Sequence, residues 1–260
     1  MILKIGFIGA GHIAHYMLTG FSTTNRAFEF VLADPDIKKT SMACREFKDS
    51  FHCTAAQNNQ DAVDRSELII LAVRPDALET ALSGLRFTPG QIVASVVAGA
   101  TLKTLTPLVF PARPVRVLPI SCVAINKSPV LVYPENNSVQ EVFSLLGQVH
   151  LLPDETTFTP GTSLVGAFYA WMIALMDETS TWTQNQGIDP VTARQLVIET
   201  IEGACGMARF QEKVSLKKIW DTLATPGGIS EHGAKILTQK GGFSSWSDAL
   251  HSVTQKMRDG

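Results

Sequence analysis

A glycine-rich turn near the N-terminus has the residue types and spacing that suit close contact with a phosphate. Gly9, Gly11 and Ala14 follow an apolar stretch at the spacing Gly-x-Gly-x-x-Ala. The first glycine permits a sharp turn, the second leaves no side chain in front of a phosphate, and the small alanine lets a helix pack closely on the strand. A helix that begins here offers free N–H groups and a positive dipole end to an anion. We therefore expect the pyrophosphate of a dinucleotide to lie against Gly9, Gly11, His12, Ile13 and Ala14.

An acidic residue at the end of the next predicted strand is placed to contact the ribose. Asp34 comes twenty residues after Ala14 and directly follows the expected strand 29–33. A carboxylate there can accept hydrogen bonds from the adenosine ribose and repels a 2′-phosphate. Lys38 and Lys39 follow closely and can serve a 2′-phosphate. We expect NAD(P)H as the cofactor, with NADH favoured because of Asp34; the open alternative is a tight turn and an aspartate that caps the next helix.

Two later strand ends are expected to line the same cofactor. Val73, Arg74 and Pro75 end one dense apolar run, and Ala98 and Gly99 follow another. Ligands of open α/β sheets bind beyond the carboxyl ends of the strands. The first group can present its backbone to the cofactor, and the second leaves room beside a nicotinamide. A surface ion pair is an equally open interpretation of the arginine.

Strand and helix patterns alternate through the first part of the chain. The expected strands are 4–8, 29–33, 68–73, 92–97, 115–118 and 129–133, and the expected helices are 13–22, 36–48, 75–85 and 101–108. Such alternation is typical of a doubly wound, mostly parallel sheet with helices on both faces. The sequence thus predicts an N-terminal α/β Rossmann domain over residues 1–155.

The pattern changes to helices alone in the second part of the chain. The expected helices are 164–182, 190–209, 216–223, 231–240 and 245–257, with Asp189 as N-cap and Pro190 at the first helical position of the second. The first of them is too apolar for a lone surface helix, so it lies in a core or against another subunit. We expect an all-α dimerisation and substrate domain over residues 156–260, in a homodimer or a higher homo-oligomer.

Composition limits the partners that the chain can have. The 260 residues carry a formal net charge of -2, with 45% hydrophobic and 18% charged residues. A nearly neutral chain has no general attraction for nucleic acid, and we expect no nucleic-acid partner. The N-terminus has no signal-peptide pattern, no uninterrupted apolar run reaches membrane-spanning length, and the four cysteines form no Cys-x-x-Cys pair. We expect no membrane partner, no bound metal, reduced thiols and a cytoplasmic location.

Four motifs in this order resemble those of pyrroline-5-carboxylate reductase. They are Phe7-Ile8-Gly9-Ala10-Gly11, Ala72-Val73-Arg74-Pro75, the stretch Ser95-Val96-Val97-Ala98-Gly99-Ala100-Thr101-Leu102, and Thr225-Pro226-Gly227-Gly228. That family makes proline by reducing a cyclic imine with NAD(P)H. The resemblance implies a Rossmann domain, a helical domain that dimerises by interleaving helices, and a small imino-acid substrate bound at the dimer interface near the Pro-Gly-Gly loop.

The resemblance also implies which residues hold the substrate. In the family, backbone and hydroxyl groups of this loop bind the substrate carboxylate, which here points to Gly227, Gly228 and Ser230, with Ser163 less directly. Two adjacent glycines can also form a backbone nest for an anion, although a plain turn between helices is the alternative. Ser230 and Thr225 are the candidate catalytic groups that would donate the proton to the imine nitrogen.

Three departures from the family pattern leave the substrate open. Ile120 stands where the family has an asparagine, Val165 lies in a region that the family fills with glycine and serine, and Ile229 replaces a threonine. Each makes the pocket more apolar, so a different imine is one alternative and a non-catalytic NAD(P)-binding sensor is another. A hydroxy-acid dehydrogenase is disfavoured because residues 164–182 contain no lysine for acid–base chemistry.

Overall fold

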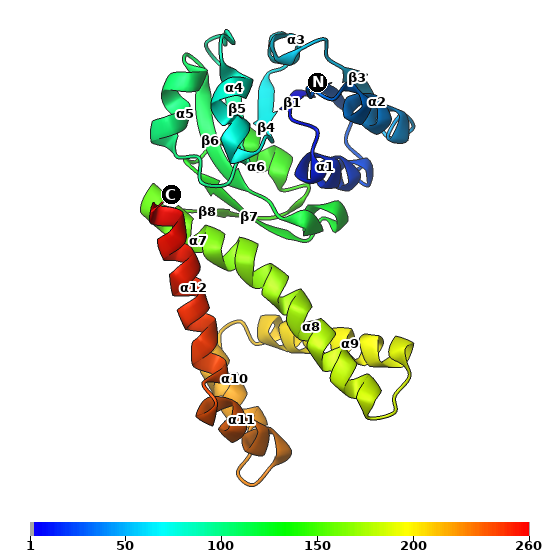
Figure 1. The fold of residues 1–260 in the computed structure, drawn as a ribbon, viewed down its shortest axis with the longest axis vertical. Helices are drawn as coiled ribbons and strands as arrows, with labels where there is room; N and C mark the ends of the chain where they lie inside the picture. The colour runs from blue at the N-terminus through cyan, green and yellow to red at the C-terminus, as the bar shows by residue number, and fades with distance from the viewer. Residues whose placement is uncertain (1–2, 260) are drawn as a thin grey trace. The chain divides into compact units, whose positions relative to one another are not determined.

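The apolar runs of the first part of the chain become the strands of a single eight-stranded sheet. A computed structural model describes residues 3–259, which form two units, one up to Val165 and one over Gly166–Asp259. The sequence places the domain boundary at 155/156, where α7 begins. Figure 1 shows the strands confined to the first unit, and the second unit is helical throughout.

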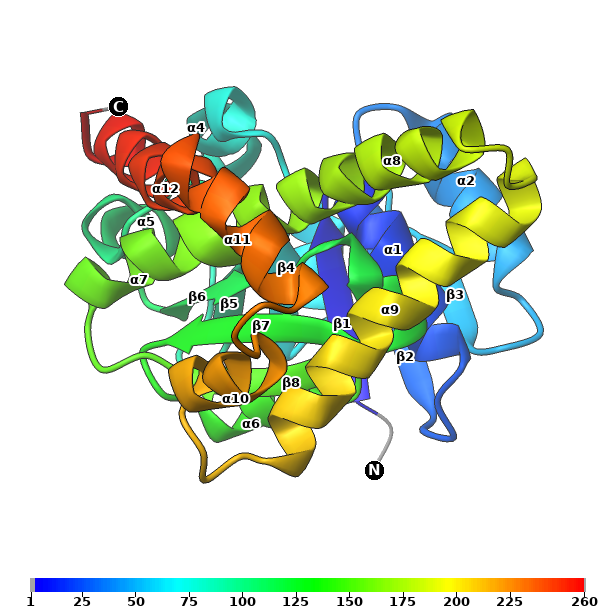
Figure 2. The same ribbon diagram turned by 90° about the horizontal axis from the view of Figure 1, so that it is seen from below.

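The sheet has the strand order of a doubly wound fold. Its order is β3-β2-β1-β4-β5-β6-β7-β8, and all neighbours are parallel except β6 and β7 (Figure 2). The order turns back on itself between β1 and β4, which is the position where such sheets bind nucleotides. The strands are β1 (Leu3–Ile8), β2 (Phe28–Ala33), β3 (His52–Ala55), β4 (Leu68–Leu71), β5 (Ile92–Ser95), β6 (Arg113–Leu118), β7 (Ser128–Tyr133) and β8 (Gly147–Leu151). The predicted mostly parallel sheet is confirmed.

Helices cover both faces of this sheet, as the strand burial shows. In β4, Leu68 and Ile70 join one apolar cluster, whereas Ile69 and Leu71 join another. The first cluster includes residues of α1 (His12–Ser22), α2 (Ile37–Glu46) and α6 (Asn137–Phe143), and the second those of α3 (Asn59–Asp64), α4 (Leu78–Leu82) and α5 (Leu102–Val109). Successive strand residues point to opposite faces, so a strand buried on both sides is apolar throughout. Two short 3-10 turns, η1 (Pro75–Ala77) and η2 (Ser121–Ile125), follow β4 and β6.

The edge strands are the part of the sheet that sequence analysis missed. Both β3 and β8 lie at the ends of the strand order, and neither contains a fully buried residue. An edge strand covered on few sides lacks the dense apolar run that reveals a central strand. The expected helix 75–85 is also shorter, since a 3-10 turn precedes the five-residue α4.

The expected helix 164–182 is wrong in one respect, because it is not one regular α-helix. The segment consists of α7 (Glu155–Thr162), a π-helical stretch at Ser163–Phe168 and α8 (Tyr169–Asn185). The Thr162 hydroxyl donates to the Phe158 carbonyl at 2.9 Å, and the Ser163 hydroxyl donates to the Thr159 carbonyl at 3.3 Å. Hydroxyls that bond back to carbonyls one turn earlier compete with the helical ladder and bend it.

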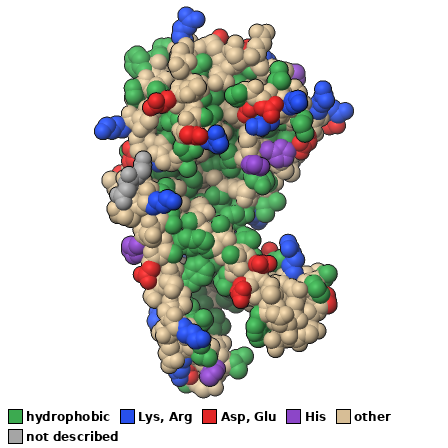
Figure 3. Space-filling view, in the orientation of Figure 1, with side chains coloured by type: hydrophobic (Ala, Val, Ile, Leu, Met, Phe, Trp, Pro, Cys, Tyr) green, Lys and Arg blue, Asp and Glu red, His purple; other side chains and the backbone are tan. Residues whose placement is uncertain are grey.

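The second unit consists of helices with very little interior of their own. They are α8, α9 (Pro190–Phe210), α10 (Leu216–Leu223), α11 (Ile229–Gln239) and α12 (Gly242–Asp259). Asp189 caps α9 by accepting from the backbone N–H groups of Val191 and Thr192, which confirms the predicted cap. Among the described residues from 166 onward, only Ala193 and Ile219 are buried. Figure 3 shows apolar side chains along the surface of these helices.

Candidate active site

The first turn of the sheet is fixed by a glycine that no other residue can replace without strain. Gly9 has a φ of +97°, and its backbone N–H donates to the Ala33 carbonyl at 2.8 Å. A Cβ at this position would lie 2.5 Å from the Ala72 carbonyl oxygen at the end of β4. By contrast, a Cβ on Gly11 would meet nothing within 4 Å. The turn is therefore tight against the sheet on one side and open toward a ligand on the other.

The helix that follows this turn begins without a protein cap. Gly11 is the N-cap of α1, and no side chain caps the helix there. No acidic residue lies in the first turn of α1 either. Ala14 is buried, so the helix lies close to the sheet as its small size predicts. Uncapped N–H groups and the positive end of the helix dipole suit a phosphate.

Asp34 is tied to the glycine turn as well as to the start of α2. Its Oδ2 accepts from the Ala10 backbone N–H at 2.8 Å, and its Oδ1 accepts from the Asp36 N–H at 2.9 Å. The Nζ of Lys39 lies 3.8 Å from Oδ1, and the Asp34 side chain is 11% exposed. A carboxylate oxygen has two acceptor positions, so one remains at each oxygen for a ribose hydroxyl. Sequence reasoning missed the bond to Ala10 because it joins residues 24 positions apart.

A groove of about 690 Å³ runs past the glycine turn and the ends of β2 and β4. Seven of the predicted cofactor residues line it, namely Gly9, Gly11, His12, Ile13, Asp34, Val73 and Arg74. Ala14 lines an adjoining cavity of about 370 Å³ between α1 and α2, together with His12, His15 and Lys39. The size of the groove suits an extended cofactor, and its lining combines glycines and alanines with the charged side chains of Asp34, Asp36 and Lys39.

Other predicted cofactor residues lie outside that groove lining. Pro75 begins η1, whereas Ala98 and Gly99 are exposed after β5, where Gly99 has a φ of +77°. The Arg74 side chain is 82% exposed and pairs with Asp76 at 3.2 Å. This ion pair is the surface interaction expected as the alternative for Arg74, although Arg74 also lines the groove.

Several groove residues escaped sequence analysis, and one of them, Asn59, follows the missed edge strand β3. Asn59 lines the groove at the start of α3 and donates through Nδ2 to the Ala81 carbonyl at 2.9 Å. Thr80 and Ala81 of α4 lie on the same wall. The only sequence signal was the polar run Gln57-Asn58-Asn59-Gln60, which is equally typical of any loop.

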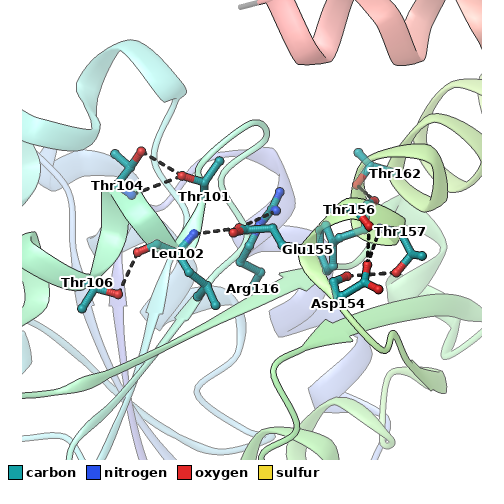
Figure 4. A network of polar contacts seen from close by, with 11 residues as sticks. Thr101, Leu102, Thr104, Thr106, Arg116, Asp154, Glu155, Thr156, Thr157 and Thr162 are labelled. Carbon is teal, nitrogen blue, oxygen red and sulfur yellow. Dashed lines mark hydrogen bonds and ion pairs between the residues drawn. The ribbon is translucent and has the colours of Figure 1, made fainter.

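A buried arginine secures the carboxyl ends of β5 and β6 to the start of α7. Arg116 lies opposite Ser95 in the register of the parallel strands β5 and β6, and its side chain is 6% exposed. Figure 4 shows that its guanidinium donates a hydrogen bond to the Glu155 carboxylate, at 2.9 Å. The same carboxylate oxygen accepts a hydrogen bond from the Leu102 backbone N–H, at 2.8 Å. The guanidinium also stands 4.1 Å from the centre of the Phe158 ring. Burial lowers the pKa of Arg116 from its ordinary value, while Glu155 acts in the opposite direction.

Ile120 occupies the strand end where the family motif has an asparagine. Its backbone N–H donates to the buried Ser128 hydroxyl at 3.1 Å. Its side chain packs with Leu118, Tyr133 and Leu152 against an apolar cluster that includes Val165. This corner of the first unit therefore presents apolar surface rather than hydrogen-bonding groups.

The Pro-Gly-Gly turn forms the entrance to α11 in the second unit. Gly227 has a φ of +77°, and the Gly228 N–H donates to the Thr225 carbonyl at 2.9 Å. Thr225 and Ser230 are both exposed. The Gly227 N–H donates to Glu231 Oε2 at 2.9 Å, and Glu231 Oε1 pairs with Lys235 at 3.1 Å. Both glycine N–H groups of the turn are therefore already bonded within the chain, one to a carboxylate and the other to a backbone carbonyl.

The remaining predicted substrate residue is differently placed. Ser163 is 1% exposed and belongs to the π-helical stretch, where its hydroxyl donates to Thr159. His232, two residues after Ser230, is exposed on α11. Within residues 3–259 there is no group of three or more histidine, cysteine, aspartate or glutamate side chains that could hold a metal ion.

Two family profiles match the two parts of the chain. The profile described as NADP oxidoreductase coenzyme F420-dependent matches residues 4–99. The profile described as pyrroline-5-carboxylate reductase dimerisation matches residues 155–259. The first covers the glycine turn and the groove, and the second covers all the helices from α7 to α12.

Proteins similar over the whole chain agree with this division. Pyrroline-5-carboxylate reductase 1 of Bacillus spizizenii is 24% identical over 98% of this chain and 89% of its own length. The crystal structure of 1-pyrroline-5-carboxylate reductase from Streptococcus pyogenes superposes with a TM-score of 0.87 at 22% identity, over 100% of this chain and 99% of that one. The structure of the Plasmodium falciparum pyrroline carboxylate reductase, solved with NADP bound, superposes with a TM-score of 0.86 at 18% identity, over 99% of this chain and 97% of that one. These structures share the fold of this chain.

One described helical stretch, Glu155–Asn185, is long and apolar enough to cross a membrane by length and composition alone. A helix that packs inside a protein passes the same test, and this stretch lies within the dimerisation profile. Its apolar surface and the near absence of a core in the second unit have a common explanation, which is association with a second copy. Profiles, relatives and motifs agree, and the chain belongs to the pyrroline-5-carboxylate reductase family.

Proposed function

We propose that this protein is an NAD(P)H-dependent oxidoreductase that reduces 1-pyrroline-5-carboxylate, or a closely related cyclic imino acid, to the saturated ring, which for the former is proline. The observation that carries the proposal is the occurrence, in one chain, of an open glycine turn over a 690 Å³ groove and a Pro-Gly-Gly turn. Family membership supports it across 98% of the sequence. The first feature suits a dinucleotide, and the second suits a small anion.

The groove fits the cofactor in size, shape and polarity. The bare side of Gly11 and the uncapped start of α1 suit the pyrophosphate, and Asp34 suits the adenosine ribose. A bound nicotinamide cofactor supplies the hydride for reduction of a C=N bond. We propose that NADH is preferred, because the Asp34 carboxylate repels a 2′-phosphate; Lys39 lies 3.8 Å away and weakens that preference.

The substrate groups follow from the hydrogen-bonding capacity of the second unit. We assign the backbone of Gly227 and Gly228 and the hydroxyl of Ser230 to the substrate carboxylate. Ser230 or Thr225 donates the proton that the imine nitrogen gains as its carbon accepts hydride. Ser163 stays a weaker assignment, since its buried hydroxyl already donates to Thr159. Positioning and electrostatics, rather than a strong acid, would supply most of the rate enhancement.

The protein associates with at least one further copy of itself. The dimerisation profile supports a homo-oligomer, and the second unit has only two buried residues among those described. We propose a homodimer or a higher homo-oligomer, a small molecule as the only partner besides the cofactor, and a cytoplasmic location. The near-neutral net charge of -2 supports the absence of a nucleic-acid partner.

A reductase of a different imine is the second candidate, and one observation favours it. Ile229 stands beside the Pro-Gly-Gly turn with 93% of its surface exposed, and Ile120 packs into an apolar cluster. Both positions carry polar side chains in the family motifs that the sequence resembles. An apolar lining would suit an imine ring with fewer polar groups.

The test is to follow oxidation of NADH and NADPH by the purified full-length protein with a panel of cyclic imines. Oxidation with 1-pyrroline-5-carboxylate and formation of proline support the main proposal. Oxidation with another imine and none with 1-pyrroline-5-carboxylate would transfer the assignment to the second candidate. Tight cofactor binding with no turnover of any imine would indicate a sensor and overturn both.

A further inference from the structure

The entrance to α11 contains a carboxylate in the place where the proposed function puts the substrate carboxylate. Glu231 lies in the first turn of α11, and its side chain bends back over the preceding turn. Its Oε2 accepts from the Gly227 N–H at 2.9 Å, and its Oε1 pairs with Lys235 Nζ at 3.1 Å. Gly228, the N-cap of this helix, has no side chain, and its own N–H donates to the Thr225 carbonyl at 2.9 Å, so the Gly227 N–H is the one that Glu231 holds.

The bond from Gly227 keeps the Glu231 side chain charged. The backbone N–H of Gly227, and then Lys235, hold the pKa of Glu231 below its ordinary value. A glutamate whose pKa lies below its ordinary value is ionised at neutral pH. The Glu231 side chain is 33% exposed and its partner Lys235 63% exposed, so solvent reaches the pair and a second anion can approach it.

Two carboxylates cannot share one N–H donor without repulsion. A substrate carboxylate that reaches the Gly227 N–H must displace Glu231, or bind beside it at the cost of like-charge contact. An imine without a carboxylate meets neither obstacle, and its protonated form is a cation that Glu231 attracts. The effect of Glu231 thus depends on whether the substrate carries a carboxylate.

We propose that Glu231 is a specificity-determining residue that competes with the substrate carboxylate for the Gly227 N–H and turns the site toward cyclic imines that lack a carboxylate. This inference rests on the proposed imine reduction. The simpler interpretation is that Glu231 only caps α11, since a glutamate at the third helical position often reaches back to the N–H groups before the helix. A cap changes stability but does not distinguish one substrate from another.

The experiment compares 1-pyrroline-5-carboxylate with 1-pyrroline, the same ring without the carboxylate, at saturating cofactor. Glu231→Gln retains an oxygen that can accept from Gly227 and removes the charge. We expect it to raise the ratio of kcat/KM for 1-pyrroline-5-carboxylate to that for 1-pyrroline about fivefold, mainly through KM. Glu231→Ala also frees the N–H and should raise the ratio about tenfold or more, provided that thermal unfolding shows a folded protein.

Two further variants separate specificity from capping. Lys235→Met removes the cation that partly neutralises Glu231, so the ratio should fall. Asp221→Asn is the matched control, because Asp221 also pairs with a lysine one helical turn away but does not touch the Pro-Gly-Gly turn; its ratio should equal that of the wild type. An unchanged ratio in Glu231→Gln, or equal losses for both imines, would overturn the inference and leave Glu231 as a cap.

A binding measurement separates this inference from the proposed function. L-proline and pyrrolidine differ only by the carboxylate, and calorimetry can compare them on the full-length protein with oxidised cofactor present. A gain in proline affinity relative to pyrrolidine in Glu231→Gln supports the inference even if the wild type reduces no imine, an outcome that would overturn only the function. Turnover of both imines with no gain in either assay overturns the inference and leaves the function standing.

Discussion

The carboxylate of Asp34 accepts a hydrogen bond from the backbone N–H of Ala10 at 2.8 Å and so joins the end of β2 to the glycine turn. The same side chain accepts from Asp36 and faces Lys39. One residue therefore shapes the glycine turn and sets the charge where we propose that the ribose binds. These two roles can be separated by experiment, because they affect different measurements.

Replacement of Asp34 by serine should shift cofactor preference toward NADPH. The variant removes the negative charge that repels a 2′-phosphate and leaves Lys39 free to attract one. We expect the ratio of kcat/KM for NADPH to that for NADH to rise about tenfold. Asp36→Ser is the control, since Asp36 caps α2 by accepting from the Lys38 N–H, and serine can keep that cap. An unchanged ratio in Asp34→Ser would show that this residue is structural only.

Replacement of Gly9 by alanine should destabilise the first unit and abolish cofactor binding. The new Cβ would lie 2.5 Å from the Ala72 carbonyl oxygen, at a φ of +97°. Gly90→Ala provides a matched control, because Gly90 also has a φ of +97° but has open space around it. We expect a loss of about 1 kcal/mol in the control and about 3 kcal/mol or more at Gly9 in urea unfolding. Equal losses would mean that the close approach to β4 has no effect.

Removal of only the acidic partner of the Arg116–Glu155 ion pair should destabilise the protein. Glu155→Gln leaves the guanidinium of Arg116 buried without a counter-ion. We expect the free energy of unfolding to fall by about 2 kcal/mol, less than for a fully buried pair because Glu155 is 32% exposed. The double variant Arg116→Met/Glu155→Gln should recover part of that loss, as measured by urea unfolding at one protein concentration. A double variant less stable than Glu155→Gln would show that the arginine contributes chiefly through its packing on Phe158.

The thiols of Cys44 and Cys53 should react with alkylating reagents in a fixed order as the pH rises. A hydrogen bond from the Cys53 thiol lowers the pKa of Cys44, whereas the same contact and burial raise the pKa of Cys53. Since the thiolate is the nucleophile, Cys44 should be labelled first, and Cys53 should stay unmodified at pH values where Cys44 reacts. Mass spectrometry of peptides after iodoacetamide treatment measures this. Cys53→Ala should slow labelling of Cys44, because burial alone then raises its pKa; equal rates in both proteins would contradict the assignment.

An aspartate in place of Ile173 should weaken self-association. Ile173 lies on α8 in the unit that has almost no core, and 52% of its surface is exposed. In a symmetric dimer each substitution counts twice, and each buried isoleucine contributes about 2 kcal/mol. We expect the dissociation constant, measured by sedimentation, to rise about 100-fold or more. Ile37→Asp in α2 is the control, since Ile37 is 64% exposed but lies in the unit with its own core. The same sedimentation for both variants would exclude α8 from the interface.

Much of the fold could be predicted from the sequence because its causes are local. The burial of successive residues in β4 on opposite faces appears as an unbroken apolar run, and the cap at Asp189 and Pro190 marks the start of α9. The glycine turn could also be predicted, because the positive φ of Gly9 and its close approach to β4 restrict that position to glycine, and the spacing to Gly11 and Ala14 completes the motif. The edge strands β3 and β8 were not predicted, because a strand at the edge of a sheet, with little of its surface buried, needs few apolar residues.

By itself the sequence determined the glycine turn, the alternating sheet, the helical second unit and the family, all of which depend on short-range spacing and on which residues are apolar. Only the tertiary structure decided what the charged groups do. In the folded chain, Asp34 accepts a hydrogen bond from the Ala10 N–H, and Arg116 lies between Glu155 and Phe158. The Glu231 side chain accepts a hydrogen bond from the Gly227 N–H. The physical reason is that a charged side chain is directed by the donors and acceptors that folding brings near it. Except for Glu231, those partners come from distant parts of the chain, and for Glu231 the direction depends on the turn conformation rather than on residue type.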